Sequence, residues 1–511
     1  MSAHPAPYER PRFRQFRLSI KREAVRRGPL TFATHLKIYV ALVGACGLLV
    51  YVFPPAVALI LSGVLIGTPL LVVAIIEARR DWLWLNPLSI FLLFLGMQLG
   101  PATTWEGIKL LNDDSLSFPL LRISVSDVAA GYFITVVGTC VMSLGLRALR
   151  PGVKSRAVEQ FAEPIDWKPH WIFLLYAAGI AAIYRPSAFL FLGVFGGVLQ
   201  CGCLAVLLNY AFSTKNLYRS SPGRFLFAAG VAVYVLAAFL GDSSSKSYTM
   251  LAFLPAIVFV SGHKKYRKWI FPGAVLLTIL YLGVVAPAVN SSRTVKGKDS
   301  YDNIMTGLRS SSPFYTGEPV LLSLQDQFDG LMGRLFEMPP VTGFMVSEVR
   351  RSGFRLGATM GNLYYAFVPR IAWQGKPSVS RGAWFTTYLQ MAPREAEATT
   401  STGMTIVGEW YWNFGLTGVV VGMFLTGLLL SGLWRLAGSY RIHPPANMML
   451  YVAILINVLN LPEATSPIVT IVALYLVFGS LIYLRNHTRK SGMHARPLTN
   501  RTLVINATSR P

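Results

Sequence analysis

"MTIVGEWYWNFGLTGVVVGMFLTGLLLSGLW", residues 404–434, carries a single charged residue, Glu409. An apolar run of about 20 residues is long enough to cross the hydrocarbon core of a bilayer as a helix. Similar runs recur along the whole chain of 511 residues, of which 53% are hydrophobic and only 14% are charged. Soluble proteins carry about a quarter charged residues. The sequence therefore predicts an all-α polytopic integral membrane protein.

Apolar patterning predicts about 12 membrane-spanning helices. They are residues 36–53, 55–77, 82–100, 125–146, 169–185, 188–212, 225–241, 247–262, 269–289, 404–434, 446–461 and 465–484. Pro54 and Pro55 make the first turn very tight, so the first two runs could instead form a re-entrant hairpin. The chain begins with a long basic arm and has no small-residue cleavage site, so no cleavable signal peptide is expected.

The distribution of Lys and Arg predicts the orientation. With the N-terminus in the cytoplasm, the inner loops hold roughly two thirds of the 47 cations and under a third of the 23 acids. The net charge of +24 is then a signal for insertion and an attraction to anionic lipid, and no nucleic-acid partner is expected. The expected domains follow in chain order. They are a basic cytoplasmic arm (1–35), a membrane domain of about nine helices (36–289), a large outer loop with short amphipathic helices (290–403), a membrane domain of about three helices (404–484) and a basic cytoplasmic tail (485–511).

This topology excludes several kinds of chemistry. No cytoplasmic loop is large enough for a nucleotide-binding domain, and no phosphate-binding Gly-rich loop ending in Lys-Ser or Lys-Thr occurs. All seven histidines fall on the cytoplasmic side, so the outer loop is expected to hold neither a metal nor a cofactor. The four cysteines lie inside apolar runs and are interpreted as small core residues. Chemistry on the outer side must then rest on Asp, Glu, Tyr, Lys and Arg.

The outer loop contains a long acid-free segment, residues 349–394. Its cations are Arg350, Arg351, Arg355, Arg370, Lys376, Arg381 and Arg394. Without acidic neighbours these cations are expected to be unpaired and available to an anion. The alternative is ordinary contact with lipid headgroups. Arg350, Arg351 and Arg355 fit that alternative best, as one face of a short amphipathic helix lying on the surface.

Two motifs in this region resemble those of a known family. "VPRIAWQGKP" (368–377) and "GEWYWNFGLTG" (408–418) are similar to motifs of the oligosaccharide repeat-unit polymerases, the Wzy-type O-antigen and exopolysaccharide polymerases. "FLGDSSSKSYTMLAFLPAI" (239–257) resembles the tight outer turn of that family, with Lys246 where the family usually carries Arg. The specific part of the resemblance covers about a tenth of the chain.

The resemblance implies a GT-C-like glycosyltransferase of the bacterial inner membrane, with both termini cytoplasmic. It would join undecaprenyl-pyrophosphate-linked repeat units into O-antigen, capsular or exopolysaccharide chains, without a metal. Membrane lipid, a chain-length regulator and a flippase of the same pathway would be its partners. An alternative is a lipid-linked oligosaccharide flippase or other transporter, although no internal repeat is evident. A second alternative is an O-antigen-type ligase, although such ligases rely on an outer-face histidine that this chain lacks.

Under this reading the leaving group is a polyprenyl pyrophosphate, whose growing charge needs cations. Arg370 and Arg381 flank the Lys-Pro match and are the predicted catalytic cations. The predicted substrate-binding residues are Lys376, Arg293, Lys246, Trp373, Tyr411 and Asn413.

The acceptor hydroxyl needs a base or an orienting acceptor. Glu409 is the first candidate, at the outer end of its span with Asn413 on the same helical face. An equally acceptable reading makes Glu409 a buried carboxylate paired with a loop arginine. Asp242 is the second catalytic candidate, and Glu463 lies in a tight outer turn where a carboxylate needs a cavity or a partner.

Overall fold

The structure is a computed structural model, and it is helical throughout the part of the chain that it describes, without a strand there. The described residues are 30–81, 86–113, 123–149, 168–184, 196–212, 221–240, 320–368, 373, 375–377, 381–395, 402–437, 444–459, 461 and 463–494. The α-helices are α2 (Phe32–Val52), α3 (Pro55–Ser62), α4 (Thr68–Asp81), α5 (Pro87–Met97), α6 (Thr103–Asp113), α7 (Val125–Ala148), α9 (Pro169–Tyr184), α10 (Gly196–Phe212), α11 (Ser221–Leu240), α16 (Val320–Leu335), α17 (Met338–Ser352), α18 (Leu363–Ala366), α19 (Gly382–Tyr388), α20 (Ile406–Ala437), α21 (Pro444–Leu459) and α22 (Thr465–His494).

Five helices of the described residues are long and apolar enough to cross a membrane. They are Phe32–Val52, Pro55–Ala78, Pro87–Asn112, Val125–Ala148 and Ile406–Ala437. Shorter apolar helices coincide with five more of the predicted spans. The chain therefore has the all-α architecture of a membrane protein. The predicted spans at 247–262 and 269–289 lie outside the described residues, so the total of about 12 stays a prediction.

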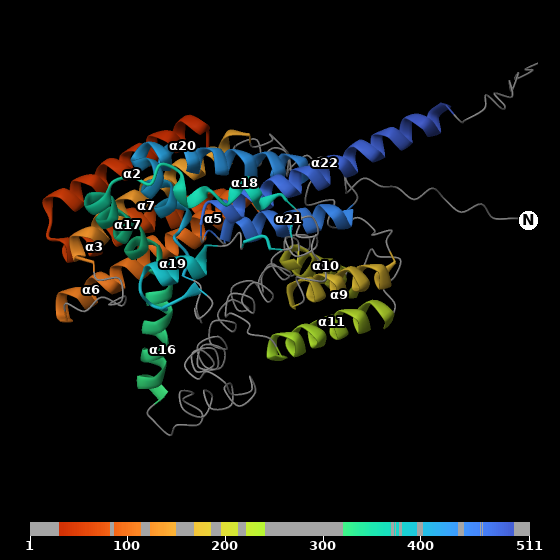
Figure 1. The fold of residues 1–511 in the computed structure, drawn as a ribbon, viewed down its shortest axis with the longest axis horizontal. Helices are drawn as coiled ribbons and strands as arrows, with labels where there is room; N and C mark the ends of the chain where they lie inside the picture. The colour runs from red at the N-terminus through yellow and green to blue at the C-terminus, as the bar shows by residue number, and fades with distance from the viewer. Residues whose placement is uncertain are drawn as a thin grey trace, which may run out of the picture.

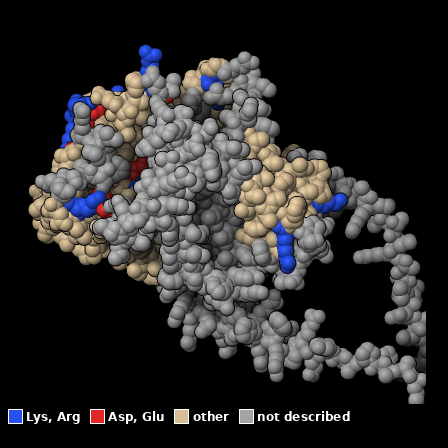
Figure 2. Space-filling model, turned by 90° about the horizontal axis from the view of Figure 1, so that it is seen from below, with Lys and Arg blue, Asp and Glu red and all other residues tan. Residues whose placement is uncertain are grey.

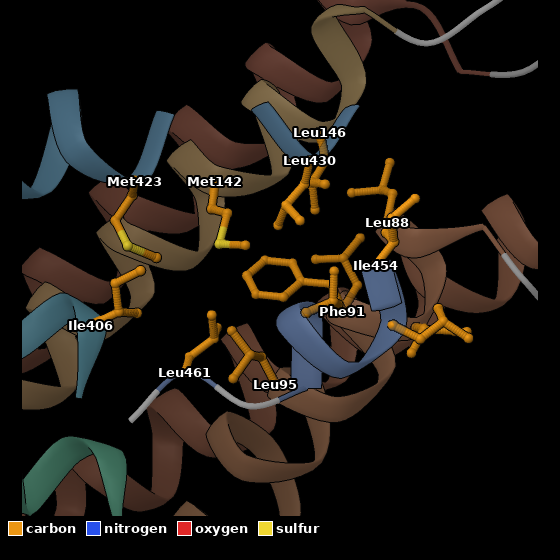
Figure 3. Packing of buried hydrophobic residues seen from close by; sticks show 14 of the residues in the cluster. Leu88, Phe91, Leu95, Met142, Leu146, Ile406, Met423, Leu430, Ile454 and Leu461 are labelled. Carbon is orange, nitrogen blue, oxygen red and sulfur yellow. The ribbon is translucent and has the colours of Figure 1, made fainter. Parts of the chain in front are cut away.

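The core of the bundle forms around α7, which packs against α2, α3, α17 and α20 (Figure 1). Figure 3 shows the ring of Phe91 from α5 among Met142 of α7, Leu430 of α20 and Ile454 of α21. All four side chains are fully shielded from solvent. Helices far apart in the sequence thus share one apolar core. The smaller group α9–α11 joins it through α10 and α21, where a Cβ on Gly202 would lie 3.0 Å from Cγ of Met449.

Two π-helical turns, η1 (Gly63–Gly67) and η2 (Gln98–Ala102), interrupt the second and third long helices where these helices cross. A Cβ on Gly67 would lie 2.1 Å from Cα of Gly100, so only glycine allows this approach. A π-turn shifts the backbone hydrogen bonds of its helix. The hydroxyl of Tyr132 on α7 lies within hydrogen-bond distance of the carbonyl oxygens of Ser62 and Leu99, at 3.1 and 2.8 Å, and its single proton is shared between them. One side chain therefore ties both interrupted helices to α7.

Helix α17 lies inside the bundle. A Cβ on Gly343 would lie 2.5 Å from the carbonyl oxygen of Asp127, so the backbones of α17 and α7 are in direct contact. Val341 and Met345 of α17 are buried. The prediction of a surface-lying amphipathic helix here is wrong for α17, because its apolar side chains are part of the core and Gly343 lets its backbone meet that of α7. α16 extends away from the end of the bundle in Figure 1.

Residues 404–434 do not form one continuous helix. Gly415 interrupts α20 with φ 64° and ψ −155°. A residue with a Cβ is strained in this conformation, whereas glycine adopts it readily. A Cβ on Gly415 would also lie 3.0 Å from Cζ of Phe354. The segment 406–414 folds back, so that the indole of Trp410 packs directly on the backbone of Gly422. The single span predicted for 404–434 is therefore two helical segments joined at a glycine.

Candidate functional site

The first segment of α20 carries Glu409, whose carboxylate joins three separate parts of the chain. Its Oε1 accepts a hydrogen bond from Oγ1 of Thr359 at 2.8 Å. Its Oε2 accepts a hydrogen bond from the backbone N–H of Ala464 at 2.6 Å. Glu409 is fully shielded from solvent. Each oxygen therefore accepts one hydrogen bond, and the carboxylate fixes the 353–368 loop and the turn before α22 against α20.

Asn413 completes this junction. Its Nδ2 donates to the carbonyl oxygen of Glu409 at 2.8 Å and to Oγ1 of Thr359 at 2.6 Å. Its Oδ1 accepts from the backbone N–H of Gly357 at 2.8 Å. The predicted shared helical face of Glu409 and Asn413 is confirmed. Because Asn413 is buried with its donor and acceptor in use, the structure gives it a role in holding the loop.

Arg381 and Glu463 lie together beside this junction. The backbone N–H of Arg381, at the N-cap of α19, donates to Oε2 of Glu463 at 3.0 Å. Burial raises the pKa of the Glu463 carboxyl, and the N–H and guanidinium of Arg381 oppose that shift. Glu463 directly precedes Ala464, whose backbone N–H binds the Glu409 carboxylate. One carboxylate therefore belongs to this turn and the other binds its next residue.

The guanidinium of Arg381 makes no ion pair within the described part of the chain. It lies over the indole of Trp384, 5.4 Å from the ring centroid, and is half-buried. Its Nη2 lies 4.0 Å from the position that a Cβ on Gly361 would take. Arg381 therefore presents a charged, planar group that lies over an aromatic ring, near the carboxylate of Glu463 but not in a salt bridge with it.

The other described site residues differ in exposure. Lys376 is buried, and its Nζ donates to the carbonyl oxygens of Ala366 and Val368, both at 2.7 Å. These contacts give Lys376 a structural role at the end of α18. Trp373 is 42% exposed and packs edge-on against Tyr365. Tyr411 packs edge-on against Phe354.

The expectation that the cations of segment 349–394 are unpaired is wrong for two of them. Arg350 pairs with Asp127 on α7 at 2.7 Å, and Arg351 pairs with Glu348 at 2.6 Å. The acids come from outside the segment, one from a distant helix and one from the position just before it. Figure 2 likewise shows acidic side chains next to basic ones on the face seen from below.

Four predicted site residues, Arg370, Asp242, Lys246 and Arg293, lie outside the described residues. Thr359 is the residue that the sequence did not bring into the site, and Glu463 was noted there without an assigned role. Glu463 has a weak signal, as an acid in a short turn between two apolar runs, and Thr359 has none. No group of His, Cys, Asp and Glu residues suited to a metal ion occurs within the described ranges.

Comparison of the chain with models of protein families gave no match. Comparisons with curated protein sequences and with solved structures also gave none.

Proposed function

We propose that this chain is a membrane glycosyltransferase that polymerises undecaprenyl-pyrophosphate-linked oligosaccharide repeat units on the outer face of the bacterial inner membrane. The proposal includes a GT-C-like fold of about 12 spans and cytoplasmic termini. The observation that carries it is that Arg381, whose guanidinium lies over the ring of Trp384, sits next to the buried carboxylate of Glu463, which accepts the backbone N–H of Arg381. The motifs at 368–377 and 408–418 lie in the same part of the chain.

The reaction needs a cation at the leaving group. A hydroxyl oxygen of the acceptor sugar attacks the anomeric carbon of the donor glycan, and the bond from that carbon to the diphosphate oxygen breaks. The electron pair stays on the diphosphate. A planar guanidinium that is never deprotonated stabilises this charge through two parallel hydrogen bonds. Arg381 has this role, together with Arg370 on the other side of the Lys-Pro match.

The reaction also needs an acceptor for the hydroxyl proton. Glu409 was the first candidate from the sequence, yet both of its oxygens already accept hydrogen bonds. Glu463 uses Oε2 for the backbone N–H of Arg381, which leaves Oε1 to receive the proton before it passes to water. Burial raises the pKa of Glu463 and so increases its affinity for that proton. Glu409 acts through Ala464 as a positioning residue for Glu463.

A clean deletion tests the proposal. Lipid-linked single repeat units should accumulate on the outer leaflet, and long glycan should disappear. Single units trapped on the inner leaflet would instead identify a transporter. Long glycan that forms but stays on the lipid carrier would identify a ligase.

Complementation with Arg381→Lys and Arg381→Met then tests the site. Both should reduce polymer formation, the Met variant by roughly a hundredfold, because removal of one charge-stabilising donor typically has that effect. Arg350→Lys is the matched control, because Arg350 already pairs with Asp127 and its side chain is 62% exposed. Normal polymer from the Arg381→Met variant would contradict the proposed mechanism.

A further inference from the structure

A second guanidinium in the outer loop, that of Arg355, is held even more tightly than that of Arg381. The backbone N–H of Arg355 donates to the carbonyl oxygen of Trp412 at 2.9 Å. Its Nη2 donates to the hydroxyl of Tyr388 at 2.9 Å. Its Cζ lies 5.1 Å from the ring centroid of Trp412 and 5.7 Å from that of Tyr388. Arg355 therefore lies against an aromatic cluster formed by Trp384, Tyr388 and Trp412, and not on a surface helix. Its alternative assignment as a contact to lipid headgroups is not supported.

The charge of Arg355 is oriented without being neutralised. The hydroxyl of Tyr388 accepts from Arg355 and donates to Oε2 of Glu348. Burial and the hydrogen bond to Glu348 raise the pKa of Tyr388, so the phenol stays neutral. Glu348 forms its ion pair with Arg351 at 2.6 Å. A neutral group thus separates Arg355 from the nearest acid of the described network.

Two buried donors here have no acceptor among the described residues. They are Nε of the Arg355 guanidinium and Nε1 of Trp412, and both are shielded from solvent. Trp412 as a whole is fully buried. An unsatisfied buried donor is unfavourable, so a ligand that supplies an acceptor would recover that loss. Both groups can only donate, and the group that satisfies them must supply oxygen acceptors.

The same cluster offers a surface for a sugar. Trp384 stacks on Tyr388 with ring centroids 5.5 Å apart and an interplanar angle of 28°. Arg355, Tyr388 and Trp384 are all half-buried, so the cluster opens on one side. The guanidinium of Arg381 lies over Trp384, whereas that of Arg355 lies over Tyr388 and Trp412. The two guanidinium groups therefore contact different rings of the same aromatic cluster.

We infer that Arg355, Tyr388 and Trp412 form an oxyanion-binding subsite separate from the Arg381 position. Its ligand is a carboxylate or phosphate group that accepts hydrogen bonds from Arg355 and from the indole N–H of Trp412. That this oxyanion belongs to a glycolipid substrate rests on the proposed function. It is then either the carboxylate of an acidic sugar in the repeat unit or a phosphate of the carrier lipid.

The test uses the purified full-length protein in detergent, with intrinsic tryptophan fluorescence and calorimetry as readouts. The probes are sodium glucuronate, inorganic pyrophosphate and, as the neutral comparison, methyl glucoside. The wild type should bind at least one of the two anions and should not bind the neutral sugar. Binding of glucuronate alone would assign the oxyanion to an acidic sugar, and binding of pyrophosphate alone would assign it to the carrier.

Four variants separate this subsite from the rest. Arg355→Met should weaken anion binding by roughly tenfold or more, as expected for the loss of a charged hydrogen-bond donor. Arg355→Lys keeps the charge but lacks the Nε donor, so it should bind less tightly than the wild type while it tests for misfolding. Arg350→Met is the control and should bind normally. Binding that Arg381→Met loses and Arg355→Met retains would overturn the inference, as would the absence of binding by either anion.

The two proposals fail differently. If the deletion strain makes normal glycan, the polymerase assignment fails while anion binding at Arg355 is unaffected. If Arg355→Met binds both anions as the wild type does, the subsite fails while the deletion phenotype is unaffected.

Discussion

Replacement of Glu409 by Gln is the sharpest test of how this site is built. The carboxylate accepts one hydrogen bond from Thr359 and one from the backbone of Ala464. A Gln side chain offers one oxygen acceptor and one N–H₂ donor. If the N–H₂ faces Ala464, two donors oppose each other. If it faces Thr359, it competes with Asn413, which already donates to that hydroxyl oxygen.

The size of the effect follows from these contacts. Hydrogen bonds to a charged group contribute about 1.5–3 kcal/mol, and a mispaired buried donor adds its desolvation penalty. We expect Glu409→Gln to lower the free energy of unfolding by about 2–4 kcal/mol. In a large domain, each kcal/mol shifts Tm by about 2 °C or more, so Tm should fall by about 4–8 °C.

The assay is thermal unfolding of the purified protein in detergent, followed by intrinsic fluorescence, together with polymer formation in the deletion strain. Glu463→Gln is the matched comparison, because its amide oxygen can still accept from the N–H of Arg381. We expect this variant to lose polymer formation with little change in Tm. The reasoning is refuted if Glu409→Gln abolishes polymer formation at an unchanged Tm, since Glu409 would then act as the base.

Three further predictions address the fold and the pH response. Gly415→Ala should lower the free energy of unfolding by about 1–3 kcal/mol, because φ is 64° there. Gly44→Ala is its control in thermal unfolding: a Cβ there has nothing within 4 Å, so stability should be unchanged or higher. Gly343→Ala should lower Tm because its Cβ would lie 2.5 Å from a carbonyl oxygen of α7, whereas Gly330→Ala meets open space. Burial raises the pKa of Glu463, and only the charged carboxylate can accept a proton. As pH falls, turnover should therefore begin to decline at a pH above the ordinary pKa of a glutamate. A pH–rate profile that stays flat down to that ordinary pKa would contradict this.

The apolar spans could be read from the sequence because each depends on its own composition. The burial of α17 could not, since Arg350 and Arg351 in its last turn favoured a helix lying on the surface. Its burial depends on the close backbone contact with α7 at Gly131, which only the folded chain reveals. The break at Gly415 was likewise hidden, because glycine also occurs in straight apolar helices that pack closely.

The site shows the same division. Glu409 stood out as an isolated acid in an apolar run, and the i, i+4 spacing correctly placed Asn413 beside it. The partners of Glu409 are a hydroxyl fifty positions earlier and a backbone N–H fifty-five positions later, and neither leaves a pattern in the sequence. The pairing of Arg350 with Asp127 is equally remote, because it depends on the docking of α17.

The break at Gly415 also bears on the depth of Glu409 relative to the lipid. The remaining helix, Leu416–Ala437, has 22 residues and is about 33 Å long at 1.5 Å per residue. That length alone spans a hydrocarbon layer of about 30 Å. The nine residues before the break are then not needed to cross the bilayer. They can lie at headgroup level, which is where the proposed function would bring a water-soluble glycan and a membrane-anchored diphosphate together.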